Sequence, residues 1–158
     1  MAKNRILYVC QEIVPYLPAS DMATLCRTLV QAMQERGNEI RTFMPRYGCI
    51  NEYRNQLHEV IRLSGMNLII DDNDHQLIIK VASIPAARIQ IYFIDNEDFF
   101  SRRATTVDEN SEEFADNDER MVFFARGVLE TVKKLRWTPD IVHCHGWFSS
   151  VAPVYLRK

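Results

Sequence analysis

The sequence contains no apolar run long enough to cross a membrane. A membrane-spanning helix needs about 20 consecutive apolar residues, and no stretch of the 158-residue sequence approaches that length. The N-terminal residues lead into a strand-like run at Arg5, without the long apolar segment and small-residue cleavage site of a signal peptide. We therefore expect a cytoplasmic protein with no membrane partner.

Positive charge is not in excess either. The chain carries 19 Lys and Arg residues against 21 Asp and Glu residues, for a formal net charge of -2. Proteins that bind nucleic acid present basic surfaces to the phosphate backbone, whereas the basic residues here are scattered along the chain. We expect no nucleic-acid partner.

Cysteine is too sparse and irregular for a disulfide framework. The sequence has four cysteines and no C-x-x-C motif. Without an export signal, free thiols in a reducing compartment are favoured over disulfides. The four residues are Cys10, Cys26, Cys49 and Cys144.

Histidine offers one pair that bears on metal binding. His143 and His145 are two residues apart, so their side chains share one face of an extended strand. A zinc site needs at least a third protein ligand, and the other histidines, His58 and His75, belong to a different region. We expect no metal site. The minor alternative, a metal-binding H-x-H protein, predicts stoichiometric zinc in the purified protein.

A glycine-rich phosphate loop is missing. Nucleotide-binding loops use glycines so that backbone N–H groups reach phosphate at a helix N-terminus. The loop after the first predicted strand, residues 11–23, contains no glycine. Asp21, where a helix begins, can cap that helix but would repel phosphate. The residues alone therefore predict a poor diphosphate site.

Strand-like and helical segments do alternate along the chain. Arg5–Cys10 is a short apolar run without strict alternation, as in a parallel strand buried on both faces. A helical pattern follows from Asp21, with Ser20 or Asp21 as its cap and Gly37 just past its end. Residues 39–44 form the next strand. We expect this βαβ unit to have a right-handed crossover.

The middle of the chain predicts an inserted β-hairpin at about residues 58–84. Residues 59–70 and 76–84 resemble two strands on either side of an acidic turn, residues 71–74. This segment interrupts the alternation of strands and helices.

The rest of the chain returns to that alternation. Residues 88–95 predict a strand and 96–100 one helical turn. Residues 101–118 are polar and acidic without an apolar period, which predicts an exposed, mobile loop. A long helix over 118–137 and a buried strand over 140–145 follow.

This order of segments predicts one domain over residues 1–158. The class is α/β, with a Rossmann-like doubly wound parallel sheet and an inserted hairpin. Ligands of such sheets bind beyond the carboxyl ends of the strands. Here that edge would be lined by residues 11–20, 95–100 and 143–148.

Three polar positions are the candidates for ligand contact at this edge. His145, at the end of its strand, can donate from a neutral imidazole to a sugar hydroxyl or a phosphate. We expect His143 to be a hydrogen-bonded core histidine. Asp116 and Asn117 precede the second long helix, either as its N-cap or as polar groups at the cleft rim.

Five motifs, in one order across nearly the whole chain, resemble a single enzyme family. They are Q-E-I-V-P (11–15), M-P-R-Y-G (44–48), Y-F-I-D-N (92–96), D-N-D-E-R (116–120) and P-D-I-V-H-C-H-G-W (139–147). Each is weak alone. Together they resemble the N-terminal domain of bacterial glycogen synthases and plant starch synthases, which is the N-terminal half of a GT-B fold.

The resemblance implies a retaining glucosyltransferase. The intact protein would move glucose from ADP-glucose to the non-reducing end of an α-1,4-glucan or maltooligosaccharide, without a cofactor. His145 and Asp116 are the candidate catalytic residues: His145 as donor to the glucose, Asp116 to orient sugar hydroxyls. The candidate substrate-binding residues are Asn117, Trp147, Tyr16 and Asn96.

The sequence departs from the family pattern at the donor site. The K-x-G-G loop of the family aligns with residues 18–21, where the lysine and both glycines are gone. Gly146 and Phe148 stand where the family has the aspartate and last histidine of H-D-W-H. We expect a truncated chain, inactive alone, without the C-terminal GT-B domain. The alternative is a non-catalytic glucan-binding or regulatory relative with a degenerate donor site.

Overall fold

The computed structural model describes residues 3–157, which are built around a six-stranded sheet. Its strands are β1 (Arg5–Cys10), β2 (Glu39–Pro45), β3 (His58–Glu59), β6 (Ile78–Ile84), β7 (Ile89–Asp95) and β8 (Ile141–His145). The spatial order is β3-β6-β7-β2-β1-β8. The strands β7, β2, β1 and β8 run parallel, while β6 and β3 form an antiparallel edge. The predicted α/β fold with a parallel sheet is confirmed.

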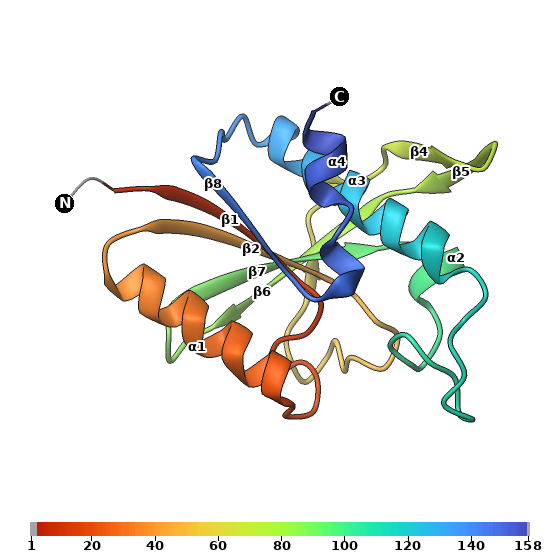
Figure 1. Ribbon diagram of the computed structural model, residues 1–158, viewed down its shortest axis with the longest axis horizontal. Helices are drawn as coiled ribbons and strands as arrows, with labels where there is room; N and C mark the ends of the chain where they lie inside the picture. The colour runs from red at the N-terminus through yellow and green to blue at the C-terminus, as the bar shows by residue number, and fades with distance from the viewer. Residues whose placement is uncertain (1–2, 158) are drawn as a thin grey trace.

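Helices cover both faces of this sheet (Figure 1). One face carries α1 (Asp21–Glu35), and the other carries α3 (Asn117–Lys134) and α4 (Ala152–Leu156). Because β1 is covered on both sides, every residue from 6 to 10 is buried, which accounts for the lack of alternation in its sequence. No helix within residues 3–157 is long and apolar enough to cross a bilayer.

Local chemistry sets both ends of α1. The side-chain oxygen of Ser20 accepts a hydrogen bond from the backbone N–H of Ala23 at 3.0 Å, so Ser20 is the N-cap. Gly37 follows the helix with φ at 91°, in the left-handed region that favours glycine. Both ends lie where the sequence predicted them.

The structure corrects the long strands predicted over residues 59–70 and 76–84. The first stretch is broken into the end of β3, a 3₁₀ turn and β4; the second is split between β5 and β6. The bounds are Ile61–Leu63 for the 3₁₀ turn, Asn67–Ile70 for β4 and Asn73–Gln76 for β5. β4 and β5 pair as a separate two-stranded antiparallel sheet, and β6 joins the main sheet.

Burial explains the break in the first stretch. Leu63 and Leu68 are five residues apart, so a continuous strand would point them to opposite faces. Both are buried, with 5% and 3% of their surface exposed. The chain turns between them at Gly65, whose φ is 96°.

The acidic turn of the β4–β5 hairpin is strained. Asp71 and Asp72 are its two central residues, with φ at 49° and 62°. Two-residue turns with both φ positive match the twist of the flanking strands but favour Asn-Gly or Asp-Gly. A side chain in this region costs free energy that glycine avoids.

We therefore predict opposite effects for the same substitution two residues apart. Asp72→Gly should raise the free energy of unfolding by about 0.5–1 kcal/mol by removing the strain, while Asp74→Gly, inside exposed β5, should lower it by a similar amount. Both variants remove one negative charge, so charge is matched. Urea denaturation followed by circular dichroism measures both, and a loss of stability in Asp72→Gly would contradict the strain argument.

Candidate functional site

The carboxyl ends of the parallel strands meet at one edge of the sheet. In the register of neighbouring strands, Cys10 pairs with His145 and Pro45 pairs with Ile94. The loop after β1 is tied to β8 there, since the backbone N–H of Gln11 donates to the carbonyl of His145 at 3.1 Å. This is the edge at which doubly wound sheets hold ligands.

His143 and His145 share one face of β8, as predicted. Their rings are nearly parallel, with centroids 6.1 Å apart. The ring of Tyr8 stacks on His143 at 4.7 Å, and its hydroxyl lies 3.3 Å from Nδ1 of His145. His143 was expected to be hydrogen-bonded; within the described chain its ring is stacked instead. Burial, with the charge of His145, lowers the pKa of His143.

Tyr8 sets the hydrogen-bonding state that His145 can offer a ligand. Burial raises the pKa of Tyr8 far above its ordinary value, so the phenol keeps its proton. When Tyr8 donates that proton to Nδ1, the neutral imidazole carries its own proton on Nε2. Nε2 is then a hydrogen-bond donor.

Asp116 is held by an arginine rather than by the helix it precedes. Its side chain makes no capping hydrogen bond at the start of α3. Instead both carboxylate oxygens accept from Arg102, each at 2.6 Å. The guanidinium of Arg102 lies over the ring of Phe114 at 4.7 Å. The hydrogen bonds from Arg102 lower the pKa of Asp116, against the opposing effect of burial.

Both predicted substrate-binding asparagines are buried and engaged within the protein. Asn117 donates to the carbonyl of Thr106 at 2.8 Å and accepts from Arg120 at 2.8 Å. Asn96 caps α2 (Glu97–Phe100) by accepting from two backbone N–H groups, and its amide nitrogen donates to the carbonyl of Gln76 at 2.8 Å. Trp147, by contrast, is 44% exposed at the end of β8.

Asp95, next to Asn96, anchors a buried ion-pair network at the same edge. Its carboxylate accepts from Arg46 at 2.8 Å and from Lys80 at 2.9 Å. Lys80 also pairs with Glu52 at 2.7 Å. Two cations and two carboxylates balance each other, which offsets the cost of their burial. The network ties the loop after β2 to β6 and β7.

A hollow of about 450 Å³ opens beside the loop after β1, and we call it the cleft hollow. Tyr16 is the one predicted site residue among those lining it within residues 3–157. The phenol oxygen of Tyr16 is buried without a hydrogen-bond partner, and burial raises its pKa to about 12. The hollow is lined by Glu12, Cys49, residues 16–20 and residues 103–105.

Sequence reasoning missed most of this lining. Glu12 belongs to the Q-E-I-V-P motif, and that motif could have marked it as a site residue, but it was not among those predicted. Arg103 and Thr105 carry no such signal, because they lie in the polar segment predicted to be an exposed loop. Between α2 and α3, residues 101–116 form no helix or strand beyond one bridge between Val107 and Glu113, while residues 117 and 118 of the predicted loop belong to α3. Its mobility stays a prediction.

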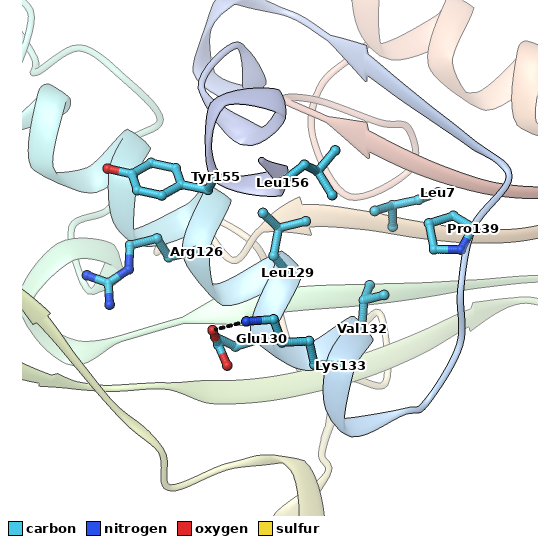
Figure 2. A pocket seen from close by; sticks show the side chains of 9 residues that line it. All are labelled: Leu7, Arg126, Leu129, Glu130, Val132, Lys133, Pro139, Tyr155 and Leu156. Atoms are coloured by element: carbon cyan, nitrogen blue, oxygen red, sulfur yellow. Dashed lines mark hydrogen bonds and ion pairs between the residues drawn. The ribbon is translucent and has the colours of Figure 1, made fainter. Parts of the chain in front are cut away.

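A second, larger hollow of about 590 Å³ lies between α3, α4 and the start of β8 (Figure 2). Its walls are largely apolar, with an ion pair between Glu130 and Lys133 at 3.1 Å on α3. None of the predicted site residues lines it. The apolar lining residues are Leu7, Leu129, Val132, Pro139, Tyr155 and Leu156.

The described part of the chain groups no three His, Cys, Asp or Glu side chains as a metal site would need. The chemistry of the carboxyl-end edge is that of hydrogen bonding. It offers an imidazole, carboxylates, a phenol and a guanidinium, which suit sugar hydroxyls.

A parallel sheet covered on both faces, with polar groups at its carboxyl ends, defines a Rossmann-like ligand-binding domain. The family model described as starch synthase catalytic domain matches residues 5–158. The chain belongs to this family.

The comparisons with individual proteins agree with this assignment. The chain is 39% identical over 154 residues to a glycogen synthase of Chlorobium limicola, covering 97% of this chain and 32% of the relative. It is 40% identical to a glycogen synthase of Chlorobium phaeobacteroides, with the same coverage. The chain thus spans about a third of the length of these relatives.

A solved structure supports the fold. The catalytic domain of starch synthase IV from Arabidopsis thaliana, bound to ADP and acarbose, matches with a TM-score of 0.81. The match covers 98% of this chain and 30% of that one, at 21% sequence identity. The doubly wound sheet therefore has the architecture of this part of a starch synthase.

The Arg102–Asp116 pair yields a pH-dependent prediction. A double-mutant cycle with Arg102→Met and Asp116→Asn should give a coupling free energy of about 1 kcal/mol at pH 7, because the pair is bidentate and partly buried. The pKa of Asp116 is lower in the folded protein, so this coupling is complete above the ordinary carboxyl pKa of about 4 and is lost as pH falls through the lowered pKa.

Urea denaturation at several pH values measures this coupling. The Glu130–Lys133 pair on α3 is the control, and its single-contact, exposed geometry should give a coupling of a few tenths of a kcal/mol. A coupling for Arg102–Asp116 no larger than the control at pH 7 would show that the bidentate geometry adds nothing beyond an exposed, single-contact pair.

Proposed function

We propose that this chain is the N-terminal domain of a cytoplasmic glycogen/starch synthase-like glucosyltransferase. The intact protein would transfer glucose from ADP-glucose to the non-reducing end of an α-1,4-glucan, with retention. Family membership over residues 5–158 supports the reaction class. The observation that carries the assignment to this edge of the sheet is His145, which Tyr8 orients at the end of β8.

The residues at this edge have complementary roles in the proposal. His145 donates from Nε2 to the glucose being transferred, where preorganised donors stabilise developing charge. Asp116 accepts from sugar hydroxyls, since a bidentate arginine leaves further lone pairs on both carboxylate oxygens. Trp147 offers exposed ring surface to the sugar, and Tyr16 forms part of the wall of the cleft hollow. Asn96 and Asn117 have an indirect role, because their hydrogen bonds to the backbone fix the segments next to these groups.

A chimaera tests the catalytic role of His145. This chain would replace the matching third of the Chlorobium limicola glycogen synthase, and transfer of labelled glucose from ADP-glucose to maltooligosaccharide would be measured. His145→Ala should lower kcat by about 100-fold, the range typical of a lost hydrogen-bonding catalytic group. His58→Ala, exposed on β3, is the matched control and should leave kcat within about twofold.

Two results of that experiment count against the proposal. A folded but inactive chimaera would show that this domain no longer supports transfer. An active chimaera in which His145→Ala and His58→Ala behave alike would remove the role of His145.

The second candidate function is glucan binding without catalysis. The loop at residues 18–21 favours it, because it lacks glycine and places Asp21 at the N-terminus of α1. That carboxylate opposes phosphate. The cleft hollow is lined by one acidic residue, Glu12, and one basic residue, Arg103, and this mixed charge suits neutral hydroxyls better than a diphosphate.

Isothermal titration separates the two functions. The isolated chain should bind maltotriose and should not extend it, because the chain spans only a third of its relatives. Titration of the chimaera with ADP-glucose then decides between them: donor binding supports the enzyme, and glucan binding alone supports the binding module. Extension of glucan by the isolated 158 residues would contradict the expected inactivity.

A further inference from the structure

Arg120, in the second turn of α3, is a buried cation without a carboxylate partner in the described chain. It is 0% exposed, and no ion pair within residues 3–157 includes it. Its guanidinium lies 5.1 to 5.8 Å from the ring centres of Phe100, Phe114 and Phe148. Burial of a charge in such surroundings is costly unless the charge is well hydrogen-bonded.

The hydrogen bonds of Arg120 go to the two ends of one segment. Nε donates to the carbonyl of Phe99 at 2.9 Å, and Nη1 donates to the carbonyl of Thr105 at 2.9 Å. Nη1 also donates to Asn117 at 2.8 Å. Because the guanidinium is planar and rigid, it fixes the distance between the two carbonyls.

We call residues 101–106, which follow α2 and include the carbonyl of Thr105, the strap. The first turn of α3 grips the strap at two further points. Asn117 donates to the carbonyl of Thr106, and Asp116 accepts both bonds from Arg102. Three residues of the D-N-D-E-R motif therefore bind the strap.

The opposite side of the strap rests on the backbone at Gly48. A Cβ at this position would lie 2.6 Å from the carbonyl oxygen of Ser101 and still closer to the carbonyl of Arg102. There is no space for any side chain here. Gly48 of the M-P-R-Y-G motif thus packs directly against the strap backbone, while residues of α3 and its N-cap bind the strap by hydrogen bonds.

The strap forms one wall of the cleft hollow. Arg103, Ala104 and Thr105 line it, and Glu12 and Tyr16 line it from the loop after β1. Any shift of the strap changes the width of the hollow and the place of Arg103 in it.

We propose that Arg120 is a positioning residue for the cleft. By holding Phe99 and Thr105 together, it fixes the strap and so presents Arg103 and Thr105 to a sugar in the hollow. This inference rests on the proposed function for the sugar. The position of the strap can be measured without a ligand.

The thiol of Cys49 reports on the strap. Cys49 lines the cleft hollow beside residues 103–105; part of its surface is exposed, and burial of the rest raises the pKa of its thiol. A displaced strap would uncover the thiol further, so it should react faster, and the pH at which its reactivity begins should shift downward. The measurement uses the full 158-residue chain with Cys144→Ala, which removes the other partly accessible thiol. Cys10 and Cys26 are buried, so Cys49 is then the thiol that reacts.

The test compares two Arg120 variants with a control on the same helix. Arg120→Lys and Arg120→Met should each raise the rate of Cys49 modification by a maleimide and weaken maltotriose binding by about tenfold, since neither side chain spans two carbonyls. The control, Arg126→Met, removes a single guanidinium–carbonyl contact between α3 and the β4–β5 hairpin. It should change both values by no more than about twofold.

Gly48→Ala should displace the strap while keeping Arg120, because its Cβ would clash with the strap backbone. It is the second test of the proposal if the Arg120 variants do not fold. It should raise Cys49 reactivity in the same way. The proposal is overturned if folded Arg120 variants leave Cys49 reactivity unchanged, or if Gly48→Ala does so when the Arg120 variants fail to fold. If wild-type chain does not bind maltotriose, the proposed function fails, and Cys49 reactivity still decides the role of Arg120.

Discussion

The cleft side of this molecule depends on one buried guanidinium. A buried cation that makes no direct ion pair depends on oxygen dipoles and aromatic faces to offset its burial. Arg120 takes its oxygens from the end of α2, from the strap and from its own helix. Satisfying one charge therefore brings three separate stretches of chain together. Burial, together with the positive charge of Arg102, lowers the pKa of Arg120 to about 10.

Most of the family motifs act on one another rather than on a ligand. The Asp95 network joins M-P-R-Y-G to Y-F-I-D-N through Arg46, and D-N-D-E-R grips the strap, which rests on Gly48. These motifs shape the edge where the parallel strands end. In the proposed function, direct contact with the sugar falls to a few groups such as His145, whose Nδ1 lies 3.3 Å from the hydroxyl of Tyr8 on the neighbouring strand.

The loop after β1 packs closely against the residue that follows β8. A Cβ at Gly146 would lie 2.8 Å from Cβ of Gln11, and φ of Gly146 is 92°. Gln11 fills that space, and its side-chain oxygen accepts from the backbone N–H of Phe148 at 3.0 Å. Glycine at position 146 therefore makes room for the side chain of Gln11.

The sequence by itself determined the parallel strands, the helices and their order, because apolar runs and helical spacing leave a local record in residue type, although β8, expected to be buried, is a partly exposed edge strand. It also placed His143 and His145 on one face, since strand side chains alternate. It did not determine that 59–70 would break, that Asn96 would be consumed as a cap, or that Arg103 would line the cleft hollow. Those depend on contacts between distant segments, and only the tertiary structure decided them. The strap has no periodic pattern of its own, because its place is set by Arg120 and Gly48 from outside it.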